Sequence, residues 1–95
     1  MKIFIKEEYA GIILQLAHKY INENPGNAGC NVYHAMAKTL ETMDIYVAYI
    51  NNMGFMMYDY SIKAMVQYIS EINDTDVPFA GGRLEEIGDY LAKLI

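Results

Sequence analysis

Apolar side chains dominate the stretch from Asn31 to Tyr58, and the other predicted elements are placed relative to it. One set recurs at three- and four-residue steps, which is the spacing of a helix face directed at a core: Val32, Met36, Leu40, Met43, Val47 and Ile50. Further apolar and aromatic residues occupy the remaining faces of its second half, among them Tyr46, Tyr49, Met53, Phe55, Met56 and Met57. We expect a long central helix over 31–53 that Gly54 ends or bends.

The same periodicity predicts three other helices. They cover about 6–22, 60–73 and 83–95, and their inward positions include Leu16, Ile69 and Leu91. Residues 22–29 hold a proline, two glycines and three asparagines, and 74–82 has a similar composition, so both are expected to be loops.

The first six residues alternate weakly between apolar and polar side chains. This alternation is typical of a short strand, but a single strand needs a partner, and no second strand is visible in the pattern. An extended lead-in or a first helical turn is therefore favoured. The predicted fold class is all-α, a compact bundle of about four helices in one domain over 1–95, with a short N-terminal extended segment as the open point.

Composition narrows the range of functions. The chain is 54% hydrophobic and 20% charged, which is typical of an ordered domain, and its formal charge of −5 disfavours direct binding to nucleic acid. A protein partner with a basic surface fits this charge better. The lone Cys30 excludes an internal disulfide, and neither a signal peptide nor a membrane-spanning stretch is apparent, so a cytoplasmic location is expected.

Cys30 and His34 lie four residues apart at the head of the central helix, and His18 faces them from the first. A zinc site needs three or four ligands, and a Cys–His nucleophile needs an orienting group and an oxyanion site. Neither set is complete here, so the expectation is that Cys30 is a small buried apolar residue and that the protein has no metal, no cofactor and no enzymatic activity.

Two loop motifs resemble binding sites without matching them. Asp74, Asp76 and Glu85 occupy positions one, three and twelve of a calcium loop, but Pro78 and Phe79 stand where that loop needs an oxygen ligand and a glycine. The Gly81–Gly82 pair precedes a helix, as in anion sites, but acidic residues follow at once. Both segments are expected to be ordinary connections.

Tyrosines and acids near Gly54 form the strongest constellation. Tyr offers a large contact area at low entropic cost, and acids complement Lys and Arg. The predicted partner-binding residues are Asp44, Tyr46, Tyr49, Met53, Phe55, Met57, Tyr58, Asp59 and Tyr60.

The function expected from this class of features is a small acidic inhibitor or regulator that occupies a basic surface of another protein. By analogy alone, phage and mobile-element proteins that block host nucleic-acid machinery, such as anti-CRISPR proteins, have this character. Three alternatives stay open: an obligate homodimer joined through the apolar half of the central helix, an enzyme that uses Cys30 and His34, and a helical DNA-binding regulator, which the acidic charge opposes.

Overall fold

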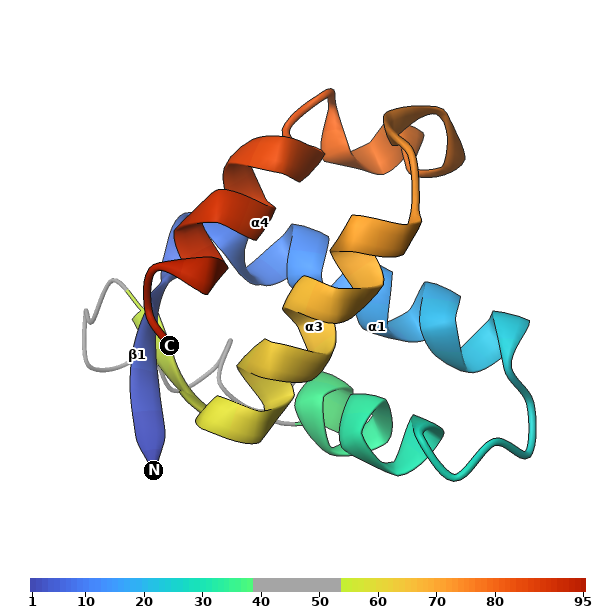
Figure 1. Cartoon of the computed structure of the whole chain (residues 1–95), viewed down its shortest axis with the longest axis horizontal. Helices are drawn as coiled ribbons and strands as arrows, with labels where there is room; N and C mark the ends of the chain where they lie inside the picture. The colour runs from blue at the N-terminus through green and yellow to red at the C-terminus, as the bar shows by residue number, and fades with distance from the viewer. Residues whose placement is uncertain (39–53) are drawn as a thin grey trace.

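The computed structural model describes residues 1–38 and 54–95, and for Phe55 the backbone alone. The elements are β1 (Lys2–Lys6), the 3₁₀ turn η1 (Glu7–Tyr9), α1 (Ala10–Glu23), a helical segment over 30–38, β2 (Gly54–Tyr58), α3 (Asp59–Glu71), the 3₁₀ turns η2 (Asp74–Asp76) and η3 (Pro78–Ala80), and α4 (Leu84–Ala92). The four helices of the described ranges form a small bundle with a pair of antiparallel strands at one edge (Figure 1). This confirms the predicted helical bundle. The predicted continuation of the central helix to 53 lies outside the described residues.

The strand pair corrects the prediction for the N-terminus. β1 pairs antiparallel with β2, with Lys2 opposite Tyr58 and Lys6 opposite Gly54, so the first residues are a strand and not a helical turn. The partner strand was not apparent because its residues are apolar on both faces, which hides the alternation of a strand. Ile5 and Met57 are buried, whereas Phe4 and Met56 are 43% and 41% exposed.

Helix α1 starts later than predicted because the strand runs to Lys6 and a 3₁₀ turn follows it. Its inward positions Ile13, Leu16 and Ala17 are fully buried. At its end, both the backbone and the side chain of Asn24 donate to the carbonyl oxygen of Tyr20, at 3.1 and 2.9 Å. Asn24 therefore satisfies a carbonyl at the helix C-terminus before Pro25 and Gly26 turn the chain.

Helices α3 and α4 are packed closely against one another. Their predicted ranges are correct to within a few residues. Gly88 of α4 allows this approach, since a Cβ at that position would lie 3.0 Å from Cγ2 of Ile69. The connection between the helices forms η2 and η3, and Asn73 and Asp76 cap η2 reciprocally.

The core unites residues from every described helix and from both strands. Its fully buried side chains include Ile5, Ile13, Leu16, Ile62, Met65, Val77, Ile87 and Leu91. A hydrogen bond joins the strand pair to α4: the hydroxyl of Tyr90 accepts from the backbone N–H of Lys6 at 3.1 Å. In the described ranges, no helix is both long enough and apolar enough to cross a bilayer.

Candidate functional site

The predicted partner-binding residues are divided by the structure. Asp44, Tyr46, Tyr49 and Met53 lie outside the described residues, as does the side chain of Phe55. Met57 is 3% exposed, so it belongs to the core and not to an exposed binding surface. Tyr58 and Tyr60 are exposed, at 44% and 53%.

Tyr58 of β2 and Tyr60 of α3 belong to an exposed surface formed by the strand pair and the start of α3. We call it the strand-pair face: Lys2, Phe4, Lys6, Met56, Tyr58 and Tyr60. The Tyr58 and Tyr60 rings are stacked, with centroids 5.1 Å apart, and Nζ of Lys2 lies 5.4 Å from the Tyr58 centroid. Among the described residues, the charged side chains of this face are therefore lysines. Of the acids predicted here, Asp59 lies beside the rings and Asp44 lies outside the described residues.

Asp59, the predicted acidic contact beside these rings, already has partners within the chain. Its carboxylate lies 3.5 Å from the N-terminal ammonium and accepts from the backbone N–H of Tyr60 at 2.9 Å. Burial alone would raise the pKa of Asp59, but the Tyr60 N–H and the ammonium outweigh it and lower that pKa. Asp59 is thus the first residue of α3, and it holds the N-terminal ammonium.

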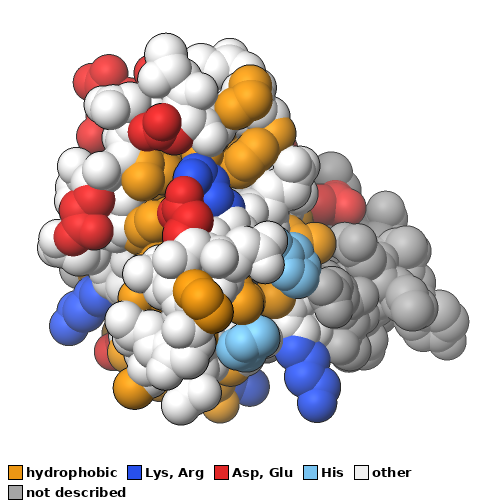
Figure 2. All heavy atoms as spheres, turned by 90° about the vertical axis from the view of Figure 1, so that its right-hand side faces the viewer, with side chains coloured by type: hydrophobic (Ala, Val, Ile, Leu, Met, Phe, Trp, Pro, Cys, Tyr) orange, Lys and Arg blue, Asp and Glu red, His pale blue; other side chains and the backbone are white. Residues whose placement is uncertain are grey.

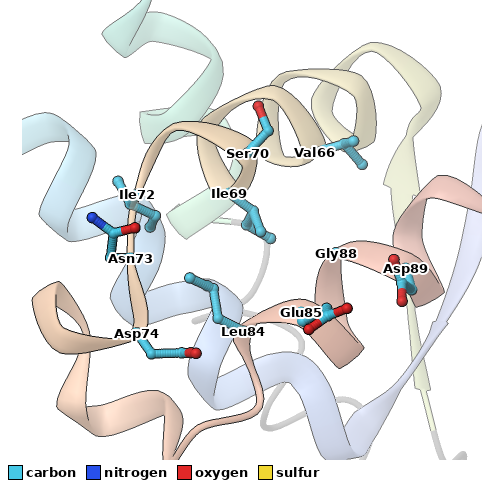
Figure 3. Close-up of a pocket in the computed structure, with 10 residues that line it drawn as sticks. All are labelled: Val66, Ile69, Ser70, Ile72, Asn73, Asp74, Leu84, Glu85, Gly88 and Asp89. Atoms are coloured by element: carbon cyan, nitrogen blue, oxygen red, sulfur yellow. The ribbon is translucent and has the colours of Figure 1, made fainter.

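A cleft lies between α3 and α4, and we call it the α3–α4 cleft. Its volume is about 340 Å³, and it is lined by Val66, Ile69, Ser70, Ile72, Asn73, Asp74, Leu84, Glu85, Gly88 and Asp89. Ile69 and Leu84 point into the space between the helices (Figure 3). Asp74 lies at one end of the cleft and Asp89 at the other, with Glu85 between them. The cleft therefore combines an apolar floor with an acidic rim.

Within the described residues, the rim carboxylates have no ion-pair partner. Asp74, Glu85 and Asp89 are exposed, and none forms an ion pair with a described Lys or Arg. The neighbouring Arg83 is directed elsewhere, since its Nη2 lies 2.6 Å from Glu86 and 3.4 Å from Glu8. Figure 2 shows acidic side chains concentrated at the upper left of one face, while most of its Lys and Arg lie in the lower half.

The sequence interpretation missed this cleft. Two of its acids were noticed only as parts of a calcium pattern that failed. A better signal is the spacing of Glu85 and Asp89, because acids four residues apart share one face of a helix. The loop position of Asp74 opposite that face depends on how α3 and α4 pack.

Cys30 is a buried apolar residue here, as expected. It is 5% exposed, and its thiol donates to the carbonyl oxygen of Asn24 at 3.0 Å. His18 and His34 are exposed. Within 1–38 and 54–95, no three His, Cys, Asp or Glu side chains are grouped as metal ligands would be.

Three tyrosines from separate elements meet on the other side of α3, and we call them the tyrosine cluster: Tyr20, Tyr33 and Tyr68. The Tyr20 and Tyr33 rings are stacked with centroids 3.8 Å apart, and Tyr68 meets Tyr20 edge-on at 5.1 Å. The Tyr33 hydroxyl donates to the carbonyl of Ala64 at 2.8 Å, and that of Tyr68 donates to Glu23 at 2.7 Å. The cluster joins α1, the 30–38 segment and α3.

Two glutamates anchor tyrosine hydroxyls and basic side chains at once, which predicts a loss of stability in acid. Arg83 and then Tyr9 lower the pKa of Glu86, and Lys19 and then Tyr68 lower the pKa of Glu23, from an ordinary value of 4.5. A lowered folded-state pKa contributes stability that is present above the unfolded-state value and lost as the pH falls through the folded-state value. We expect the free energy of unfolding, measured with urea, to decrease from about pH 5 to pH 3.

The variants Glu23→Gln and Glu86→Gln should each make this decrease shallower. Glu85→Gln is the matched control, because it removes a carboxylate that has no ion-pair partner in the described ranges. An acid profile that neither variant changes would show that these contacts do not contribute to stability.

The described fold and surfaces define a small acidic helical bundle that carries a two-stranded antiparallel sheet. Comparison with known proteins adds no further identification: no protein-family model matches the chain, no curated protein matches its sequence and no solved structure matches its fold. Its function is therefore argued from its surfaces.

Proposed function

We propose that this protein is a non-enzymatic binding module whose α3–α4 cleft accepts a basic segment of a partner protein. The observation that supports this proposal is the joint presence of an apolar lining, Val66, Ile69, Ile72 and Leu84, and of three rim carboxylates that have no ion-pair partner among the described residues. An ordinary solvated face would have acids without such a lining.

The chemistry of the cleft suits Lys and Arg side chains. Their aliphatic stems pack on apolar surface while their charged ends reach outward to carboxylates. The three rim acids repel one another in the free protein, and a bound cation relieves that repulsion. The net charge of −5 adds long-range attraction to a basic partner and repulsion of phosphate backbones.

The role that fits such a module is that of an inhibitor or regulator. An acidic protein that covers a Lys- and Arg-rich groove denies that groove to nucleic acid, which is the mode of action that the analogy with anti-CRISPR proteins suggests. In this role the partner protein, and not the nucleic acid, is what the module binds.

The binding proposal is tested with a short peptide that alternates leucine and arginine, compared with a peptide in which glutamine replaces every arginine. We expect the arginine peptide to shift the amide resonances of residues 69–74 and 84–89, and we expect added salt to weaken this binding. Glu85→Lys should weaken it about tenfold. Glu7→Lys changes the net charge equally at an exposed residue that is not part of the cleft lining, and it is the control. Equal weakening by both variants would mean that the peptide responds to overall charge and not to the cleft.

A homodimer is the second candidate, and the strand-pair face favours it. Apolar or aromatic surface is exposed on this face by Phe4, Met56, Tyr58 and Tyr60. Sedimentation of the wild type and of Phe4→Lys decides this question, because a dimer that uses this face should dissociate in the variant. A monomeric wild type at micromolar concentration would remove the alternative.

A further inference from the structure

A second hollow lies over the tyrosine cluster, on the side of α3 opposite to the α3–α4 cleft, and we call it the tyrosine pocket. Its volume is about 260 Å³, and its lining is Tyr20, Gly29, Val32, Tyr33, Ala64, Gln67, Tyr68 and Glu71. Tyr33 and Tyr68 are 4% and 5% exposed, whereas Tyr20 is only partly buried. Rings thus form the base of the pocket, and Tyr20 presents the most open ring surface.

The surroundings of the pocket are electronegative. Glu71 lines it and accepts from Nε2 of Gln67 at 2.8 Å. Glu23 accepts the Tyr68 hydroxyl, and the lining itself contains no Lys, Arg or His. The nearby Lys19 is paired with Glu23.

The pKa values of Tyr33 and Tyr68 reflect these negative charges in part. Burial, and then Tyr20 and Glu71, raise the pKa of Tyr33. Burial, and then the hydrogen bond to Glu23, raise the pKa of Tyr68. Burial disfavours any charge, but the smaller contributions of Glu71 and Glu23 disfavour a phenolate and favour a cation near them.

We propose that the tyrosine pocket binds a methylated ammonium group. Tyrosine rings attract a cation through their electron-rich faces, and this attraction is strongest for a cation that loses little hydration on binding. Methyl groups make the ammonium large, apolar and weakly hydrated, so it also gains from contact with Val32 and Ala64. A bare ammonium would stay hydrated, and a carboxylate or phosphate would be repelled by Glu71. The group can come from a choline-like small molecule or from a trimethylated lysine side chain.

The test is a titration of the whole protein with choline, followed by NMR of the tyrosine rings. Its neutral isostere, in which carbon replaces the quaternary nitrogen, is the matched ligand. We expect choline to shift the Tyr20 and Tyr33 resonances and to bind about tenfold more tightly than the isostere. Trimethyllysine and lysine, each as a capped amino acid, form the second arm. Trimethyllysine binding more tightly than choline assigns the pocket to a modified protein, and the reverse order assigns it to a small molecule.

Variants separate the ring from the charge. Tyr20→Phe should retain choline binding, whereas Tyr20→Leu and Glu71→Gln should each weaken it several-fold. Glu71 is exposed, so Glu71→Gln tests the pocket without removing core packing. Equal binding of choline and its isostere, or no shift with either, overturns the proposal.

The two proposals fail separately. Glu85→Lys should lose the arginine peptide and keep choline, because Glu85 lines the α3–α4 cleft and not the tyrosine pocket. Loss of choline binding in Glu85→Lys would contradict the assignment of choline to the tyrosine pocket.

Discussion

Replacing Tyr33 with alanine is expected to lower the free energy of unfolding by about 3–5 kcal/mol, the usual effect of deleting a buried aromatic ring. The ring is 4% exposed, stacks on Tyr20 at 3.8 Å and meets Tyr68 edge-on at 6.0 Å. Its removal leaves a cavity where α1, the 30–38 segment and α3 meet. Urea denaturation followed by circular dichroism measures the change.

Tyr33→Phe separates the hydroxyl from the ring. It keeps the stacking and removes only the hydrogen bond to the Ala64 carbonyl, so it should lower stability by about 1 kcal/mol. Tyr60→Ala is the matched control, since Tyr60 is 53% exposed, and it should have an effect below about 1 kcal/mol. If Tyr33→Ala were as mild as Tyr60→Ala, the tyrosine cluster would not be part of the stabilising core.

Replacing Gly54 with alanine is expected to lower the free energy of unfolding by about 2 kcal/mol, within the usual range for overpacking, because it disturbs the pairing of β1 and β2. A Cβ at this position would lie 2.1 Å from Cζ of Phe4 and 2.4 Å from the carbonyl oxygen of Ile5. The Phe4 ring can rotate away because it is partly exposed, but the Ile5 carbonyl belongs to the backbone of β1. The strands must therefore move apart, and the loss is measured as the shift of the urea midpoint.

A double variant shows which contact matters. In a Phe4→Ala background, Gly54→Ala should still destabilise the protein, but by less, because the backbone contact with Ile5 persists. Gly11→Ala is the control: nothing lies within 4 Å of a Cβ there, and alanine is the better helix former, so stability should rise by up to about 1 kcal/mol. An unchanged midpoint in Gly54→Ala would contradict the close pairing of β1 and β2.

Much of the helical architecture could be predicted from residue spacing. Leu16, Ile69, Ile87 and Leu91 recur with helical period and are buried, because a helix turns the same face to the core every three or four residues. The ends of α3 and α4 were also close to prediction, since turn-forming residues flank them.

The surfaces were harder to predict. Tyr58 and Tyr60 were predicted to be binding residues and are exposed, but Met57, the neighbour of Tyr58 in β2, faces the core. Strand geometry explains this difference, because neighbouring side chains of a strand point to opposite faces. The sequence interpretation placed the end or bend of a helix at Gly54 and no strand after it, so it did not separate Met57 from its exposed neighbours.

The sequence by itself determined the class of this protein, an acidic helical bundle, and many of its core positions and helix ends follow from local periodicity and turn composition. The tertiary structure alone decided the pairing of β1 with β2, the convergence of Tyr20, Tyr33 and Tyr68, and the position of Asp74 opposite Glu85 and Asp89. Helical periodicity reports contacts within a few residues, and it is therefore legible in the sequence. Strand pairing and clefts join residues that are distant in the chain, and their geometry depends on how the elements pack.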